Sequence, residues 1–172
     1  MSYEEKAVIL QPFSQRALSR IYYEPMKIVL KRYYGDRRVT KSRMELWHDN
    51  KVVMCCEARE PRFDRYTEAF AGCSQSCLAE GVWLCKPMPS LWSPMTPTIV
   101  KSPGHRSCRF AASSGGNHVE VNIVMVGRSD GCENVAERGL TDGKAVFEEL
   151  VRWMYRAFER GEPVTVEVKS EK

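Results

Sequence analysis

Three consecutive segments near the C-terminal end of the chain constrain its fold most. Residues 118–126 form a nearly continuous apolar run, which is typical of a strand buried on both faces. Apolar side chains then recur at helical spacing over residues 142–160, at Phe147, Leu150, Val151, Met154 and Phe158. Gly161 ends this helix, and valines alternate with polar residues over 164–168, as in a final strand. The succession of strand, helix and strand predicts a domain that mixes α and β structure.

The part of the chain that precedes these segments is predicted to be mostly antiparallel β structure. Apolar and polar residues alternate in three stretches with turn-forming residues between them, at 26–34, 40–47 and 51–57. Residues 58–76 are polar and irregular, which indicates a surface loop. Prolines separate two shorter strands, over 77–85 and 98–101. We therefore expect a β-rich α+β fold, a curved mixed sheet or sandwich with one long C-terminal helix and a final strand.

The length of 172 residues fits one domain, 26–172, preceded by an N-terminal helical extension over 1–25. The extension carries apolar residues at helical spacing and is predicted to dock on this domain or on a protein partner. No run of about 18 apolar residues is available for a membrane span. The N-terminus lacks the basic and apolar regions of a signal peptide. We expect synthesis in the cytoplasm, with any release to the cell wall occurring by lysis or secretion.

Charge and cysteine content narrow the possible partners and cofactors. The chain has 26 Lys and Arg against 22 Asp and Glu, a net charge of +4 that gives no argument for nucleic-acid binding. Basic residues between Arg32 and Arg43 are interpreted as a solvated hairpin surface, with a site for an acidic polymer as the alternative. The seven cysteines are expected to be reduced, and several of them buried. Their spacing does not complete a zinc-ligand set, so no metal or other cofactor is expected.

The segment Ser129-Asp130-Gly131-Cys132 has the clearest chemical potential. A glycine turn here presents a cysteine, whose thiolate is a nucleophile, and Arg128 and Arg138 are cations that favour the thiolate. The N–H groups of Gly131 and Cys132 are candidate donors to an oxyanion. Asp130 is expected to cap the turn through hydrogen bonds to the backbone. The alternative is a glycine-rich turn with an incidental buried cysteine.

The order of these elements resembles the C-terminal half of L,D-transpeptidase catalytic domains, whose signature is Ser-His-Gly-Cys. Residues 26–168 resemble a compact branch of that superfamily, found largely in phage and mobile-element genes of gut bacteria. Residues 78–83 are similar to the Ile-Pro-Glu-Gly-Thr-Tyr of that branch, and Pro103-Gly104 falls where the branch has a comparable pair. The chain departs from the family at three positions: Asp130 replaces the second histidine, Asn122 takes the place of the upstream histidine, and Asn134 replaces an arginine.

The resemblance implies an L,D-transpeptidase type of fold and two alternative functions. In the first, the chain is a degenerate copy kept as a binding or structural module of a phage or mobile element, recognising cell-wall peptides. In the second, it is a cysteine-dependent transpeptidase or hydrolase of peptidoglycan stem peptides, with Cys132 as nucleophile, His118 or His105 as base and Gly131 in the oxyanion hole. The candidate substrate contacts are Ser129, Arg128, Asn134 and Trp92. The three departures favour the first function, because an enzyme needs its base.

Overall fold

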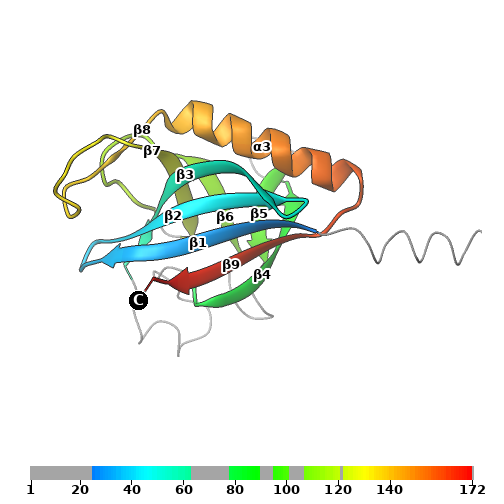
Figure 1. Cartoon of the computed structure of the whole chain (residues 1–172), viewed down its shortest axis with the longest axis horizontal. Coiled ribbons are helices and arrows are strands. Elements are labelled where there is room, and N and C mark those ends of the chain that lie inside the picture. The colour runs from blue at the N-terminus through cyan, green and yellow to red at the C-terminus, as the bar shows by residue number, and fades with distance from the viewer. Residues whose placement is uncertain (1–24, 63–77, 90–94, 101–106, 121, 172) are drawn as a thin grey trace, which may run out of the picture.

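The computed structural model of the chain describes residues 25–62, 78–89, 95–100, 107–120 and 122–171 (Figure 1). This part of the chain is a β-rich α+β fold with one helix, α3 (Gly143–Glu159). The strands are β1 (Met26–Gly35), β2 (Val39–His48), β3 (Lys51–Pro61), β4 (Gly81–Met88), β5 (Thr96–Val100), β6 (Cys108–Ala112), β7 (Ile123–Ser129), β8 (Leu140–Thr141) and β9 (Val164–Ser170). The predicted N-terminal extension, His105 and Trp92 lie outside the described residues.

The strands form a closed mixed barrel. They are hydrogen-bonded in the order β3-β2-β1-β9-β4-β5-β6-β7, and β7 then pairs back to β3, while β8 adds to the other side of β7. The closing pairs are Glu57 with Gly127, Ala58 with Val126 and Arg59 with Met125. Two neighbouring pairs are parallel, β1 with β9 and β6 with β7. The sequence predicted a curved sheet or sandwich, and it did not reveal this closure, which joins residues distant in the chain.

The core fills the barrel and continues onto α3. Alternate residues of the strands point inward, so Ile28, Leu30, Met44 and Leu46 are fully buried in one apolar cluster. The helix runs along one side of the barrel, against β6 and β7 (Figure 1), and adds Val146, Leu150, Met154 and Ala157 to the same cluster. Each of the valine, leucine, isoleucine and methionine side chains in this cluster contributes roughly 1.5–3 kcal/mol through burial. The predicted long helix and final strand are confirmed, and Gly161 ends the helix with φ +68°.

The predicted strand over 118–126 is wrong in its first half. The strand begins at Ile123, because Asn122 adopts φ +60°, a left-handed conformation that interrupts extended backbone. A different strand, β6, precedes it and was not predicted. The predicted burial on both faces is confirmed for β7, since every residue from Ile123 to Gly127 is buried.

The predicted loop over 58–76 is wrong over 58–61, and residues 63–76 lie outside the described residues. The predicted solvated basic hairpin holds for Arg37, Arg38 and Arg43, which are exposed, and is wrong for its two other basic residues. β3 continues to Pro61, and its polar residues Arg59 and Glu60 are buried. On the hairpin, Lys41 is 0% exposed and Arg32 is 8% exposed. These charged groups tolerate burial because each is hydrogen-bonded within the fold.

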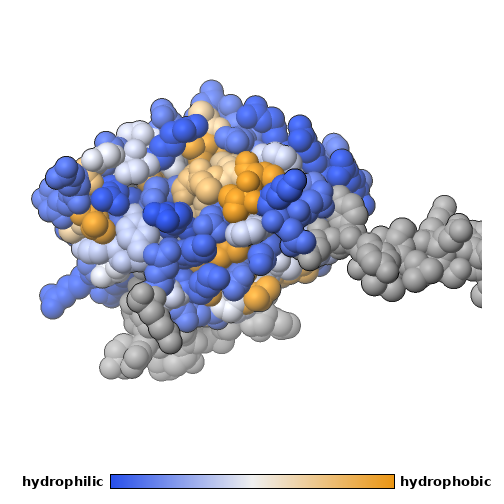
Figure 2. All heavy atoms as spheres, in the orientation of Figure 1, coloured by the Kyte–Doolittle hydropathy of each residue, from blue (hydrophilic) through white to orange (hydrophobic). Residues whose placement is uncertain are grey.

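The face shown in Figure 2 is mainly hydrophilic, and its most extended hydrophobic region lies between α3 and the hairpin of β2 and β3, with smaller hydrophobic spots elsewhere. Val52, at the start of β3, is 42% exposed. Among the described residues, no helix is both long enough and apolar enough to cross a membrane.

Candidate functional site

The predicted catalytic turn belongs to a loop over residues 129–139, the Cys132 loop, which connects β7 to β8. Asp130 closes this loop: its Oδ1 accepts the N–H of Cys132 at 2.9 Å, and its Oδ2 accepts the N–H of Gly139 at 2.9 Å. The Asp130 N–H donates in turn to the Gly139 carbonyl at 3.1 Å. These two backbone N–H donors lower the pKa of the Asp130 carboxyl. The predicted capping role of Asp130 is confirmed.

Lys41 anchors the loop to the outer surface of β2. Its Nζ donates three hydrogen bonds to loop carbonyls, those of Val135 at 2.8 Å, Ala136 at 2.9 Å and Arg138 at 2.7 Å. An ammonium has three protons and no acceptor, so these three carbonyls satisfy it completely. Burial lowers the pKa of Lys41, and the nearby charge of Arg59 adds to that effect. A side chain that points out of the barrel is thus enclosed by the loop above it.

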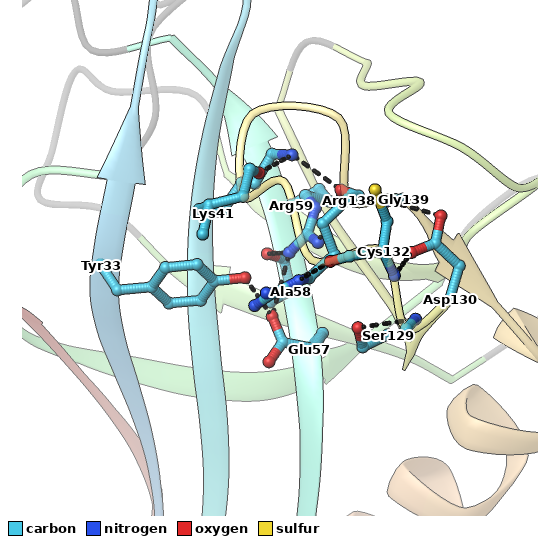
Figure 3. A network of polar contacts seen from close by, with 12 residues as sticks. Tyr33, Lys41, Glu57, Ala58, Arg59, Ser129, Asp130, Cys132, Arg138 and Gly139 are labelled. Carbon is cyan, nitrogen blue, oxygen red and sulfur yellow. Dashed lines mark hydrogen bonds and ion pairs between the residues drawn. The ribbon is translucent and has the colours of Figure 1, made fainter.

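Arg59 supports the loop from the neighbouring strand, β3. Its Nη2 donates to the Arg138 carbonyl at 3.2 Å, and its Nη1 donates to the Ala58 carbonyl at 2.9 Å and to Glu57 Oε2 at 3.2 Å. The Tyr33 hydroxyl donates to the same Glu57 oxygen at 2.6 Å, and burial raises the pKa of Tyr33. Figure 3 shows these side chains leaving three adjacent strands and converging beneath the Cys132 loop. The loop is therefore part of the folded framework.

The two proposed oxyanion donors already have acceptors inside the loop. The Gly131 N–H donates to Ser129 Oγ at 3.2 Å, and the Cys132 N–H donates to Asp130, as described above. Gly131 has φ +80°, which confirms that a glycine is needed to make the turn. Cys132 is half-buried, and its carbonyl accepts a hydrogen bond from Arg138 Nε at 2.8 Å. The turn presents the cysteine as predicted, with its N–H groups directed at the loop's own side chains.

His118 lies on an exposed segment before β7 and does not start a strand. Its side chain is 55% exposed, and its Nε2 lies 3.3 Å from Glu120 Oε1. Within the described ranges, no hydrogen bond joins this imidazole to the Cys132 sulfur. The role of His118 as a base stays a prediction, and that of His105 falls outside the described residues.

The other predicted contact residues serve the loop or face solvent. Asn134 Oδ1 accepts the Ala136 N–H at 3.1 Å, so this side chain shapes the loop. Arg128 is exposed, and its Nε lies 4.0 Å from Asp142 Oδ2. In the part of the chain that the structure covers, no group of three or more His, Cys, Asp and Glu side chains is placed to hold a metal ion. The five cysteines in these ranges are free thiols.

A cavity of about 640 Å³ opens at the end of the barrel where β1 and β9 finish, and sequence reasoning missed it. It is lined by Arg32, Tyr33, Tyr34, Gly35, Thr40, Ala79, Glu80, Ser170 and Glu171. These residues come from four separate segments of the chain, so no local sequence motif predicts the cavity. The only signal in the sequence was the basic cluster that begins at Arg32.

Arg32, one of the residues that line this cavity, belongs to a buried ion pair with Glu60. Arg32 Nε lies 3.2 Å from Glu60 Oε2, and Arg32 Nη2 lies 3.1 Å from Glu60 Oε1. Arg32 also donates to the Leu78 carbonyl, while the Leu78 N–H donates to Glu60 Oε1 at 3.0 Å. The pair is thus neutral as a unit and ties residue 78 to the barrel.

A scan against protein-family models, a search of curated proteins and a search of solved structures found no match for this chain.

Proposed function

We propose that this chain is a non-catalytic binding module built on a barrel of the L,D-transpeptidase type, carried by a bacterial phage or mobile element, and that it recognises cell-wall peptides. Such a module reaches the cell wall by lysis or secretion. The proposal is carried by Asp130. This residue replaces the histidine of the family signature, and it binds the N–H of the cysteine that a catalytic turn would leave open to substrate.

The magnitudes support binding over catalysis. Loss of one oxyanion donor lowers the rate of an enzyme by roughly 10²–10³, and a general base contributes roughly 10²–10⁴. Both N–H groups of the Cys132 turn are occupied, and the described histidine His118 is hydrogen-bonded to Glu120. A cysteine in this setting has little rate acceleration to offer.

The direct test is to incubate the purified protein with peptidoglycan sacculi and with soluble stem peptides. We expect the protein to sediment with sacculi and to leave the peptides intact. The Cys132→Ser variant should sediment to the same extent. Release or exchange of peptide products by the parent, abolished in Cys132→Ser, would instead establish the cysteine-dependent enzyme, and failure to sediment would refute the binding function.

Thiol reactivity tests the state of Cys132 without any assumption about substrate. The assay uses a background in which Cys73 and Cys77 are replaced by serine, and it follows modification by a small disulfide reagent. Cys55 is exposed, whereas burial raises the pKa of Cys56 to about 12 and removes it from the reactive set. We expect Cys132 to react no faster than Cys55. A rate for Cys132 tenfold above that of Cys55 would show an activated nucleophile.

A further inference from the structure

The barrel-end cavity lies where the pairing of β1 with β9 ends. The two strands stay in parallel register up to the pair Arg32 and Ser170, and the Glu171 N–H then donates to the Arg32 carbonyl at 2.8 Å. Between Arg32 and Tyr34 the register of β1 with β2 shifts, and this shift is a bulge in β1. Bulges bend a strand and re-aim its side chains, and they occur often at barrel rims and beside binding sites. The cavity volume of about 640 Å³ lies within the range of ligand pockets, roughly 300–1,000 Å³.

The charged groups of this cavity that are not paired within the described part of the fold are negative. The guanidinium of Arg32 is matched by the carboxylate of Glu60 on two oxygens, so it has no charge to offer a ligand. Glu80 and Glu171 then remain, both exposed at the rim. Glu80 Oε1 accepts a hydrogen bond from the Ser170 hydroxyl, which lowers the pKa of Glu80 and keeps it ionised at neutral pH.

The wall of the cavity also holds an unsatisfied polar group. Thr40 is 5% exposed, and its Oγ1 has no hydrogen-bond partner among the described residues. A buried hydroxyl without a hydrogen-bond partner destabilises the fold by roughly 1–3 kcal/mol, so such a group in a cavity wall points to a polar ligand that bonds to it. The hydroxyls of Tyr33 and Tyr34 are already bound to Glu57 and Asp36. Lys41 Nζ also lies 5.3 Å from the centre of the Tyr34 ring, so one face of that ring is taken and the remaining ring surface is what the tyrosines offer a ligand.

We propose that this cavity binds the primary ammonium group of a peptide side chain, with Glu80 and Glu171 as its counter-ions and Thr40 Oγ1 as a third acceptor. An ammonium carries three donors and no acceptor, and it interacts favourably with aromatic faces. A carboxylate ligand is disfavoured, because both rim charges repel it and Arg32 is engaged. The inference rests on the proposed function in its choice of a peptide as the bearer of the amine.

The test compares two probes that differ in charge but little in shape, Nα-acetyl-lysine methylamide and Nα-acetyl-norleucine methylamide. Binding to the full chain is followed through backbone amide resonances in a titration. We expect the lysine probe to perturb Thr40, Glu80 and Ser170, to bind at least tenfold more tightly than the norleucine probe, and to weaken as salt is added. Equal binding of the two probes, no binding, or perturbation confined to other residues would overturn the proposal.

Variants assign the effect to the cavity. Glu80→Gln combined with Glu171→Gln should weaken binding of the lysine probe at least tenfold, and Thr40→Val should weaken it severalfold. Glu159→Gln, which removes an exposed carboxylate at the end of α3, serves as the matched control and should change nothing. An unchanged affinity in the double variant, with an unchanged amide spectrum as proof of folding, refutes the site.

The sacculus assay separates this inference from the proposed function. If the lysine probe binds in the cavity but the protein does not sediment with sacculi, the cavity assignment stands and the cell-wall function fails. If the parent and the Glu80 and Glu171 double variant sediment equally and the lysine probe does not bind, the cell-wall function stands and the cavity assignment fails.

Discussion

Replacing Lys41 by methionine should release the Cys132 loop from the barrel. The methionine side chain has a similar length and keeps the packing under the loop, but it leaves the carbonyls of Val135, Ala136 and Arg138 without their donor. Hydrogen bonds to charged groups contribute roughly 1.5–3 kcal/mol each. Relief of the buried ammonium offsets part of this loss. We expect the free energy of unfolding to fall by about 3 kcal/mol.

The assay combines urea unfolding with thiol modification. In Lys41→Met the loop should also open locally, so the Cys132 thiol should react faster than in the parent, while buried Cys56 should not change. Arg43→Met is the matched control, because Arg43 lies on the same outer face of β2 but is exposed. If Lys41→Met and Arg43→Met have the same stability within about 0.5 kcal/mol and the same Cys132 reactivity, Lys41 does not anchor the loop.

Three further predictions address the ion pair, the cap and the helix start. Arg32→Met should destabilise the fold by about 3–5 kcal/mol, because it leaves the buried Glu60 carboxylate without its counter-ion. The double variant Arg32→Met with Glu60→Met should recover part of that stability in urea unfolding. The pKa of Asp130 in the folded protein lies below its usual value of 3.8. The ionised carboxylate therefore contributes its full stabilisation at pH values above 3.8, and this stabilisation is lost as the pH falls through the pKa of the folded state. The stability difference between the parent and Asp130→Asn should therefore be constant above about pH 5 and shrink on acidification, and a difference that widens on acidification would contradict this. A Cβ at Gly143 would lie 2.2 Å from the Ser113 carbonyl oxygen, so Gly143→Ala should lower the free energy of unfolding by at least about 1–3 kcal/mol, and an unchanged thermal midpoint would contradict this close packing.

Local patterns in the sequence predicted the elements that local forces determine. The hairpin strands, α3 and β9 follow from alternation, helical spacing and the stop at Gly161, and the structure confirms them. The capping role of Asp130 was also predictable, because an aspartate bonds to the N–H two residues later in its own turn.

Contacts between residues far apart in the chain could not be predicted from the sequence alone. Arg59 and Glu60 look like loop residues, since nothing adjacent to them in the chain reveals the partners that make their burial possible. The same holds for Lys41, whose acceptors lie almost a hundred positions further along the chain. The error at 118–126 has a different cause, because a single left-handed residue, Asn122, outweighed the apolar pattern around it.

The place of β9 in the barrel has a consequence for how the protein folds. Among the described strands β9 comes last along the chain, but it lies between β1 and β4 in the barrel wall. Until it forms, those two strands have open edges that can pair with other chains, and the barrel has no continuous wall. Contacts between the two ends of a chain also form slowly, because the intervening loop must close first. We therefore expect folding to be completed only after synthesis of β9, and truncations that remove β9 to yield aggregates in place of smaller folded domains.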